Sequence, residues 1–276
     1  MLVPISSADD PLLAPYLAVK ERDLIRRDGL FIVEGKVTLG RLVETSRFPV
    51  ESVFVADTRI KPLAETLARL DPAVPIYVAQ QDVLDRVAGF HLHRGVLALA
   101  RRGEDMACEA LIAAQPARST LLALVDLSNH DNVGACFRNA AALGAAGVLL
   151  DAGSCDPLYR KSIRVSAGTA LSLPFARSGT GAEMMATLKQ HDFDVWALTP
   201  SGGEPLPDLT PPHRLALMLG AEGPGLPSAL MAQARRVSIP MREGIDSLNV
   251  ATAGAIALAH VFAQSRGQRF NITSEA

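Results

Sequence analysis

The sequence predicts an α/β protein whose sheet is largely parallel and is covered by helices. Three observations lead to this fold class. Apolar, strand-like segments alternate with helix-like segments along most of the chain, which is the pattern of α/β domains. In the second half, strand-like segments such as residues 215–219 are apolar almost throughout, as expected for strands buried on both faces. Glycine-rich turns join several of these strands to a following helix.

The first part of the chain predicts a compact domain with a mostly parallel or mixed sheet. Helices are expected over residues 15–27, 36–46, 62–70 and 82–88, and strands over residues 30–34, 53–56, 75–78 and 95–100. Asp82 stands where its side chain can cap the fourth helix. Gly103, Pro116 and several charges then interrupt the pattern around one short helix at residues 109–115. We therefore expect a domain over residues 1–103, a linker over 104–118 and a second domain over 119–276.

The second domain predicts a parallel sheet with helices between its strands. Strands are expected over residues 121–127, 147–150, 173–176, 193–199, 215–219 and 237–241, and helices over residues 133–143, 156–167, 182–191, 227–234 and 249–262. The last helix is apolar around most of its circumference. That is more apolar surface than one buried side needs, so we expect it to pack against both the core and a partner.

Composition and charge limit the functional classes. The 276 residues are 49% hydrophobic and 20% charged, which indicates a globular protein, and no apolar run is long enough to cross a membrane. The N-terminus lacks the features of a signal peptide, so a cytoplasmic protein is expected. A net charge of −2 argues mildly against a general nucleic-acid binder. Three basic clusters still offer local RNA contacts: Arg22, Arg26 and Arg27; Arg94, Arg101 and Arg102; Arg160, Lys161 and Arg164.

Cysteines and histidines do not predict a metal site. Cys108, Cys136 and Cys155 are too widely spaced for a metal-ligand pair or a disulfide framework. His91 and His93 form a close pair without other ligands nearby, which favours a structural role. We expect no metal cofactor.

Three segments run from an apolar strand through a polar or glycine-rich turn into a helix, at residues 125–140, 217–227 and 237–254. In an open parallel sheet, such turns at the carboxyl ends of strands converge on one ligand crevice. Ser247 and Asn249 directly precede the last helix, so by themselves they suit a helix cap as well as a ligand site. The turns together supply the polar side chains of one predicted site: Asn132, Arg138, Glu222, Ser247 and Asn249.

These segments resemble the motifs of the SpoU (TrmH-type) RNA 2′-O-ribose methyltransferases, part of the knotted SPOUT superfamily. The resemblance rests on Asn132 and Arg138, on Gly-x-Glu-Gly-x-Gly at residues 220–225, and on Ile-Pro-Met…Ser-Leu-Asn-Val at residues 239–250. It covers residues 119–276 well. More loosely, residues 31–35 and 93–96 resemble the small RNA-recognition domain that precedes the catalytic domain in many of these enzymes.

The resemblance implies a particular methyl donor, an RNA substrate and an oligomeric state. The cofactor would be S-adenosyl-L-methionine and the acceptor a ribose 2′-OH of rRNA or tRNA. The C-terminal segment would pass through a loop to form a trefoil knot, and the protein would be a homodimer through its C-terminal domain. By resemblance, and for Thr199 by its place at a strand end, the cofactor pocket maps onto Thr199, Gly220, Ala221, Gly223, Ile239, Met241 and Leu248.

The resemblance also implies roles for the polar residues. Arg138 matches the residue proposed to act on the 2′-OH, and Asn132 helps to place it. Because arginine is effectively always protonated, Arg138 either acts as a general base in an unusual environment or grips the phosphate and stabilises the developing alkoxide. Glu222 would pair with Arg138 or orient Asn132. Ala251 stands where the family commonly has serine, which removes one hydroxyl from the third motif.

Two other functional classes compete with this interpretation. A non-catalytic RNA-binding or ribosome-assembly factor could keep the same fold, but the retained polar residues argue against it. A Rossmann-type oxidoreductase would require a glycine-rich turn after the first strand of the domain, and no Gly-x-Gly-x-x-Gly occurs there. We therefore predict an enzyme that methylates RNA.

Overall fold

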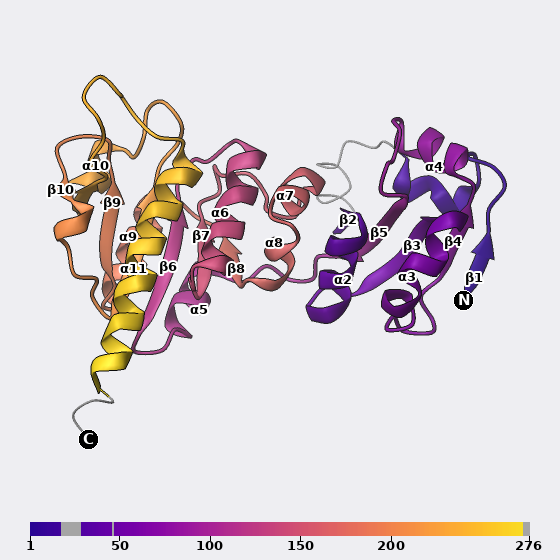
Figure 1. The fold of residues 1–276 in the computed structure, drawn as a ribbon, viewed down its shortest axis with the longest axis horizontal. Helices are drawn as coiled ribbons and strands as arrows, with labels where there is room; N and C mark the ends of the chain where they lie inside the picture. Colours follow the sequence, from indigo (N-terminus) through magenta and orange to yellow (C-terminus); the bar gives the residue numbers. More distant parts are fainter. Residues whose placement is uncertain (18–28, 46, 273–276) are drawn as a thin grey trace. The chain divides into compact units, whose positions relative to one another are not determined.

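The computed structural model describes residues 1–17, 29–45 and 47–272 (Figure 1). The chain forms two compact units, which we call unit 1 and unit 2. Unit 1 comprises Met1–Glu104 together with Pro157–Ser172, and unit 2 comprises Asp105–Asp156 together with Leu173–Ala276. A segment from the second half of the chain therefore completes the unit formed by the first half.

Unit 1 contains a mixed sheet with the strand order β1-β4-β3-β5-β2. Its strands are β1 (Leu2–Pro4), β2 (Leu30–Glu34), β3 (Val50–Ala56), β4 (Ile76–Ala79) and β5 (Val96–Arg101). β5 runs antiparallel to β2 and β3, while β4 pairs in parallel with β1 and β3. The helices are η1 (Pro11–Tyr16), α2 (Lys36–Thr45), η3 (Asp57–Arg59), α3 (Ile60–Leu67), α4 (Gln81–Ala88), α7 (Arg160–Val165) and α8 (Thr169–Ser172). The late segment belongs here because α7 packs on β2 and α8 packs on α2.

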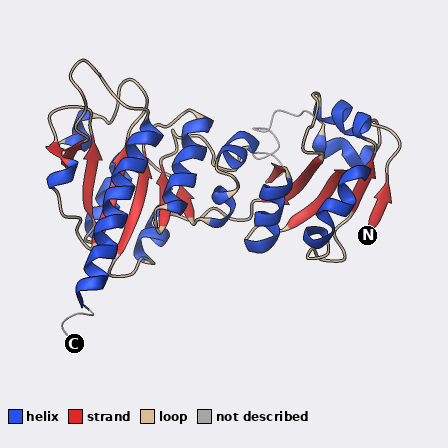
Figure 2. Cartoon of the chain, in the orientation of Figure 1, coloured by secondary structure: helices blue, strands red, loops and turns tan. Residues whose placement is uncertain are grey.

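Unit 2 contains a sheet of order β10-β12-β9-β11-β6-β7-β8 in which each neighbouring pair is parallel (Figure 2). Its strands are β6 (Ser119–Leu124), β7 (Gly147–Leu150), β8 (Phe175–Arg177), β9 (Asp194–Leu198), β10 (Glu204–Pro205), β11 (Arg214–Leu219) and β12 (Arg235–Ser238). Its helices are α5 (Cys108–Ala113), α6 (His130–Ala142), α9 (Gly181–Gln190), η4 (Leu206–Asp208), α10 (Ser228–Met231) and α11 (Val250–Ile272).

Helices cover both faces of the unit 2 sheet because its strands are apolar on both sides. Residues of α5, α9 and α10 share one core with alternate residues of the strands, including Ala216 and Met218 of β11. Leu217 and Leu219 point to the other face, where α11 packs on β11 and lies beside α6 (Figure 1). The α/β class with parallel strands is therefore confirmed. α5, which was expected within the linker, places Leu111 and Ile112 in the unit 2 core.

Several expected element bounds were wrong for physical reasons. The expected helix over 156–167 begins only at Arg160 and ends at Val165, and α8 follows after left-handed residues at Ala167 (φ 51°) and Gly168 (φ 81°). β12 ends at Ser238 rather than 241, since Pro240 has no N–H for a strand ladder. Asp82 does not cap α4: the helix begins one residue earlier, and Gln80 is its N-cap residue.

Short edge strands and the chain's first helix also differ from expectation. β1 and β10 were missed because two or three residues carry no periodicity, and both pair at the edge of a sheet. The helix expected over 15–27 corresponds in its described part to the 3-10 helix Pro11–Tyr16, and its remainder, including Arg22, Arg26 and Arg27, lies outside the described residues. α11 continues ten residues past the expected end at 262.

Two features of the described residues bear on function. None of the helices in these ranges has the length and apolar character needed to cross a membrane. Among the same residues, no group of three or more histidine, cysteine or acidic side chains is placed to hold a metal ion.

Candidate active site

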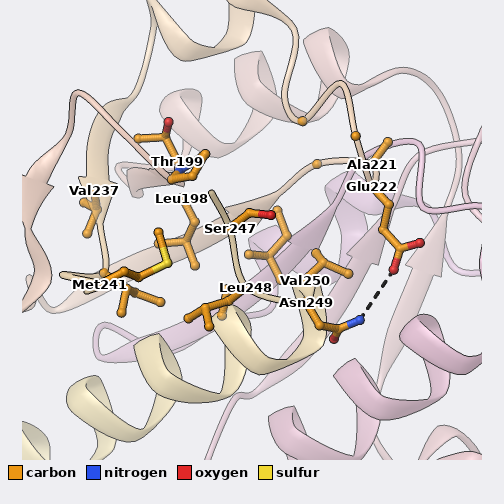
Figure 3. Close-up of a pocket in the computed structure, with 17 residues that line it drawn as sticks. Leu198, Thr199, Ala221, Glu222, Val237, Met241, Ser247, Leu248, Asn249 and Val250 are labelled. Carbon is orange, nitrogen blue, oxygen red and sulfur yellow. Dashed lines mark hydrogen bonds between the residues drawn. The ribbon is translucent and has the colours of Figure 1, made fainter. Parts of the chain in front are cut away.

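A pocket of about 370 Å³ opens at the carboxyl ends of β9, β11 and β12, where they meet the start of α11 (Figure 3). Parallel strands place the loops that follow them at one edge of the sheet, so this is where a ligand crevice is expected. The pocket is lined by all seven residues that the sequence predicted for the cofactor: Thr199, Gly220, Ala221, Gly223, Ile239, Met241 and Leu248. Three of the five predicted catalytic residues also line it: Glu222, Ser247 and Asn249.

One wall of the pocket is a backbone turn that closes on itself after β11. The N–H of Gly225 donates to the carbonyl of Ala221 at 3.1 Å, and these two residues form an isolated antiparallel bridge. A Cβ atom at Gly220 would lie 2.4 Å from the carbonyl carbon of Gly225 and from the backbone nitrogen of Leu226. Position 220 therefore requires glycine because a Cβ atom would collide with the neighbouring backbone. Its own dihedral angles do not require glycine. Gly220, Gly223 and Gly225 of this turn line the pocket, so much of this wall is main chain.

The opposite wall is apolar and comes from β9, β12 and the third motif. The N–H of Thr199 donates to the carbonyl of Val237 at 2.9 Å, which joins the ends of β9 and β12. Met241 and Leu248 face this part of the pocket in Figure 3, beside Leu198. The site thus combines an apolar wall with a polar backbone wall, which is the usual composition of a small-molecule pocket.

The polar end of the site is a hydrogen-bond network of three side chains from three separate motifs. Asn132 Nδ2 donates to Glu222 Oε1. Asn249 Nδ2 donates to Asn132 Oδ1 at 3.0 Å. It also donates to the same Glu222 oxygen at 3.4 Å, the bond that is dashed in Figure 3. Asn132 is 5% exposed, whereas Glu222 and Asn249 reach the surface. Glu222 was predicted either to pair with Arg138 or to orient Asn132. In the structure it bonds to Asn132.

Asn249 both caps a helix and joins this network. Its Oδ1 accepts from the N–H of Ala251 at 2.9 Å and from the N–H of Thr252 at 3.3 Å, so it satisfies the first free donors of α11. Its Nδ2 is left for Asn132 and Glu222. The cap therefore fixes the rotamer that presents the amide to the site. Ala251 takes part through its backbone alone, because its carbonyl accepts from Asn139 Nδ2 at 2.9 Å.

Arg138 lies apart from this network. It is exposed on α6, is not among the residues lining the pocket, and forms no ion pair with Glu222 in the described part of the chain. Helix geometry explains the separation. Asn132 and Asn139 are seven residues apart and share the face toward α11, whereas Arg138 is turned about 100° from Asn139. Ser247 lines the pocket mouth and is exposed.

The motifs agree with a family model. Residues 119–259 match the model of the SpoU rRNA Methylase family, which covers the whole pocket and the polar network. The chain belongs to this family.

Relatives of this SpoU protein share most of its length. It is 41% identical over 262 residues to an uncharacterized tRNA/rRNA methyltransferase of Mycobacterium bovis, a match that covers 92% of this chain and 89% of the relative. A second uncharacterized tRNA/rRNA methyltransferase, from Mycobacterium avium, is 32% identical and covers 88% of this chain and 82% of the relative. The similarity therefore extends through the first unit as well as the family region.

Solved structures of similar fold include an RNA 2′-O ribose methyltransferase, with a TM-score of 0.80, 26% identity and coverage of 96% of this chain and 100% of that one. The AdoMet-bound rRNA methyltransferase of Sinorhizobium meliloti has a TM-score of 0.81 at 20% identity, with coverage of 94% and 97%. At that identity the likeness shows the fold alone. The mixed α/β architecture of the SpoU protein thus recurs in whole chains and not only in its second unit.

Sequence reasoning missed part of the site in this SpoU chain. Asn139, which ties α6 to the backbone of α11, follows Arg138 directly and reads as an ordinary helix residue. The other missed residues are pocket-lining positions whose sequence signal is that of a buried core or a turn: Leu198, Pro200, Leu219, Val237, Val250 and Ala253. One sequence signal could have identified Asn139. It follows Asn132 by seven residues, a spacing that places both side chains on the same side of α6.

Replacing Asn249 by alanine should lower the stability of the fold by about 1 kcal/mol, because the helix cap is lost. For a unit of this size, that corresponds to a decrease in melting temperature of roughly 2–4 °C. Asn249→Asp is the matched variant, because it keeps the capping oxygen and replaces the amide donor with a second carboxylate next to Glu222. We expect Asn249→Asp to melt above Asn249→Ala and yet to be inactive in methyl transfer. A wild-type melting temperature for Asn249→Ala in a thermal scan would contradict the capping role.

Proposed function

We propose that this protein transfers a methyl group from S-adenosyl-L-methionine to a ribose 2′-OH of rRNA or tRNA. S-adenosyl-L-methionine is the methyl donor of this family of RNA methyltransferases, and one AdoMet-bound enzyme shares this fold. The observation that carries the proposal is that the three motifs meet at one site, where a cavity of about 370 Å³ lies beside the network of Asn132, Glu222 and Asn249.

The residues of the pocket fit the chemistry of this donor. The main chain of residues 220–223 lines the pocket and offers N–H and C=O groups that can match the hydrogen-bonding edge of an adenine, because glycines at 220 and 223 let a ligand approach the backbone closely. Leu198, Met241 and Leu248 provide apolar surface for the base and ribose. The bound donor supplies an electrophilic methyl group, and the protein must hold that group in line with the acceptor oxygen.

The acceptor side follows from the same geometry. Asn132 is held by two hydrogen bonds, so its position relative to the pocket is fixed before any substrate binds. Ser247 stands at the mouth and can bond the incoming ribose. Arg138, on the exposed side of α6, grips the substrate phosphate and stabilises the negative charge that grows on the 2′ oxygen. A permanently charged guanidinium suits this role better than proton abstraction.

The finer features of the fold belong to the same proposal. Unit 1 recognises RNA, and unit 2 forms a homodimer through α11, on which Ile256 is 38% exposed. The chain segment leading to α11 passes through a loop of unit 2 as a trefoil knot. The protein acts in the cytoplasm, where its RNA substrates are made and processed.

Mapping 2′-O-methyl marks on rRNA and tRNA from cells with and without the gene tests this function. We expect one mark to disappear with the gene and to return with the wild-type copy. Calorimetry should show binding of S-adenosyl-L-methionine and none of NAD, which separates the enzyme from an oxidoreductase. If no mark changes although the donor binds, the 2′-O assignment is wrong and a non-catalytic RNA-binding or ribosome-assembly role becomes the better account.

A further inference from the structure

Unit 1 carries a group of exposed aromatic rings on one short loop, residues 89–95, between α4 and β5. Phe90 is 40% exposed although it is a large apolar side chain. His91 and His93 are exposed as well, and their rings meet edge to face with centroids 4.4 Å apart. Neither histidine belongs to a metal-ligand group in the described residues. Exposed rings clustered on one loop need an explanation other than core packing.

The carboxylate of Asp85 holds this loop in place. Asp85 Oδ1 accepts from the N–H of Leu92 at 2.9 Å and from Gln81 Nε2 at 2.8 Å, and Asp85 Oδ2 lies 2.6 Å from His91 Nδ1. The bond to His91, followed by the bond from Leu92, lowers the pKa of Asp85 to about 2, so the carboxylate stays charged at neutral pH. Leu92 is fully buried beneath the loop. The rings are thus presented by a fixed platform.

Arg94 of this loop and two arginines from other segments, Arg59 and Arg160, lie around the rings. The guanidinium carbon of Arg160 lies 5.0 Å from the centre of the Phe90 ring, and its Nη1 lies 3.9 Å from Glu34 Oε2. Arg59 Nη2 donates to the carbonyl of His93 at 3.1 Å. The side chain of Arg94 lies across Gly35, where an added Cβ would come within 2.7 Å of Arg94 Cδ. Cations therefore stand at the edges of an aromatic surface.

We propose that this surface, formed by Arg59, Phe90, His91, His93, Arg94 and Arg160, binds unpaired nucleotides of the substrate RNA. A base stacks on the exposed part of Phe90 while the arginines contact the flanking phosphates. Proteins recognise single-stranded RNA by this combination, whereas duplex RNA is recognised mainly through its backbone and offers no free base face. The inference rests on the proposed function, because it takes the RNA to be the methyl acceptor.

The stacking part of the proposal is tested by Phe90→Ala. The probe is a short fluorescein-labelled oligouridine, whose binding is followed by fluorescence anisotropy. Loss of one base–aromatic stack should weaken binding about 5- to 150-fold, and Phe90→Tyr should restore it. Leu12→Ala, which removes another exposed apolar side chain of unit 1, should leave binding unchanged. Unchanged binding by Phe90→Ala, or an equal loss on a blunt RNA duplex, would overturn the proposal.

The phosphate contacts are tested by a charge-matched pair of variants. Arg94→Ala should reduce the dependence of oligouridine binding on salt by roughly 0.7 in the log–log slope, the contribution of one phosphate contact to a single strand. Arg69→Ala removes an exposed arginine paired with Glu44 elsewhere in unit 1 and should leave the slope unchanged. Equal slopes for wild type and Arg94→Ala would contradict the phosphate contact.

Calorimetry and mark mapping separate this inference from the proposed function. Phe90→Ala should bind S-adenosyl-L-methionine as the wild type does, because its ring lies in unit 1 and the pocket lies in unit 2. If wild type restores a 2′-O mark and Phe90→Ala binds RNA normally, the surface is wrong and the function stands. If Phe90→Ala loses RNA but wild type restores no mark, the surface stands and the reaction is wrong.

Discussion

Replacing Arg138 by alanine should lower methyl transfer at least about a hundredfold while leaving the affinity for S-adenosyl-L-methionine unchanged. Removing a single group that stabilises developing negative charge typically costs 10²–10³ in rate. The donor should still bind, because Arg138 is not among the residues that line the pocket. Fold stability should also be unaffected, because Arg138 is exposed on α6. Single-turnover transfer of a labelled methyl group, together with calorimetry of donor binding, measures both quantities.

Two further variants make the Arg138 prediction specific. Lys189→Ala removes another exposed cation of unit 2, on α9, and should keep full activity. Arg138→Lys keeps the charge but loses the two-pronged guanidinium geometry that suits a phosphate, so an intermediate rate is expected. If Arg138 instead acts as a general base, the wild-type rate will rise with pH through one ionisation that the lysine variant shifts. Full activity of Arg138→Ala would refute the assignment.

Replacing Gly220 by alanine should destroy the donor pocket. The added Cβ would lie 2.4 Å from two backbone atoms of the Gly225–Leu226 peptide, and backbone cannot move aside as a flexible side chain can. Overpacking typically costs about 1–3 kcal/mol, and a clash with backbone that cannot move aside belongs at the upper end of that range. The turn between Ala221 and Gly225 must open to accommodate the alanine side chain at position 220. We expect a melting temperature lower by roughly 6–12 °C and no measurable binding of S-adenosyl-L-methionine.

Gly244→Ala is the matched control for Gly220→Ala. Gly244 has a φ of 84°, but a Cβ there would meet nothing within 4 Å, and the residue does not line the pocket. Its cost is the backbone strain of a left-handed alanine, about 1–2 kcal/mol, without a clash. Donor binding should therefore survive in Gly244→Ala. Circular dichroism at low temperature separates loss of the pocket from loss of the fold. Normal donor binding by Gly220→Ala would show that the turn does not form the pocket wall.

Local patterns in the sequence predicted most of the architecture. Alternating apolar strands and helices indicated the sheet of unit 2, and the two expected strand ranges 30–34 and 147–150 match β2 and β7 residue for residue. Such patterns work because a strand or helix is held mainly by contacts of known period. They fail where the position of a segment depends on contacts with residues far away in the sequence. The helices α7 and α8, for example, complete unit 1 although they lie between strands of unit 2 in the sequence.

The candidate site was predicted in the same uneven way. Its residue types could be predicted because three segments each run from a strand through a polar or glycine-rich turn into a helix. Three such turns in one domain are typical of a ligand site. The pairing of Glu222 with Asn132 and not with Arg138 was left open by the sequence. Asn139 and the apolar wall at Leu198 and Val237 were missed, because an asparagine in a helix or a leucine in a strand carries no local sign of facing a pocket.

The fold class, the three motifs and the glycine turn at residue 220 could be predicted from the sequence alone, because each depends on residues close together in the chain. Which of these residues meet depends on the folded chain. Asn132, Glu222 and Asn249 come from segments up to 117 residues apart, and their hydrogen bonds exist only because parallel strands bring their carboxyl ends to one edge. The double role of Asn249 has the same cause: its oxygen serves the local helix, and its nitrogen serves partners that only the folded sheet supplies.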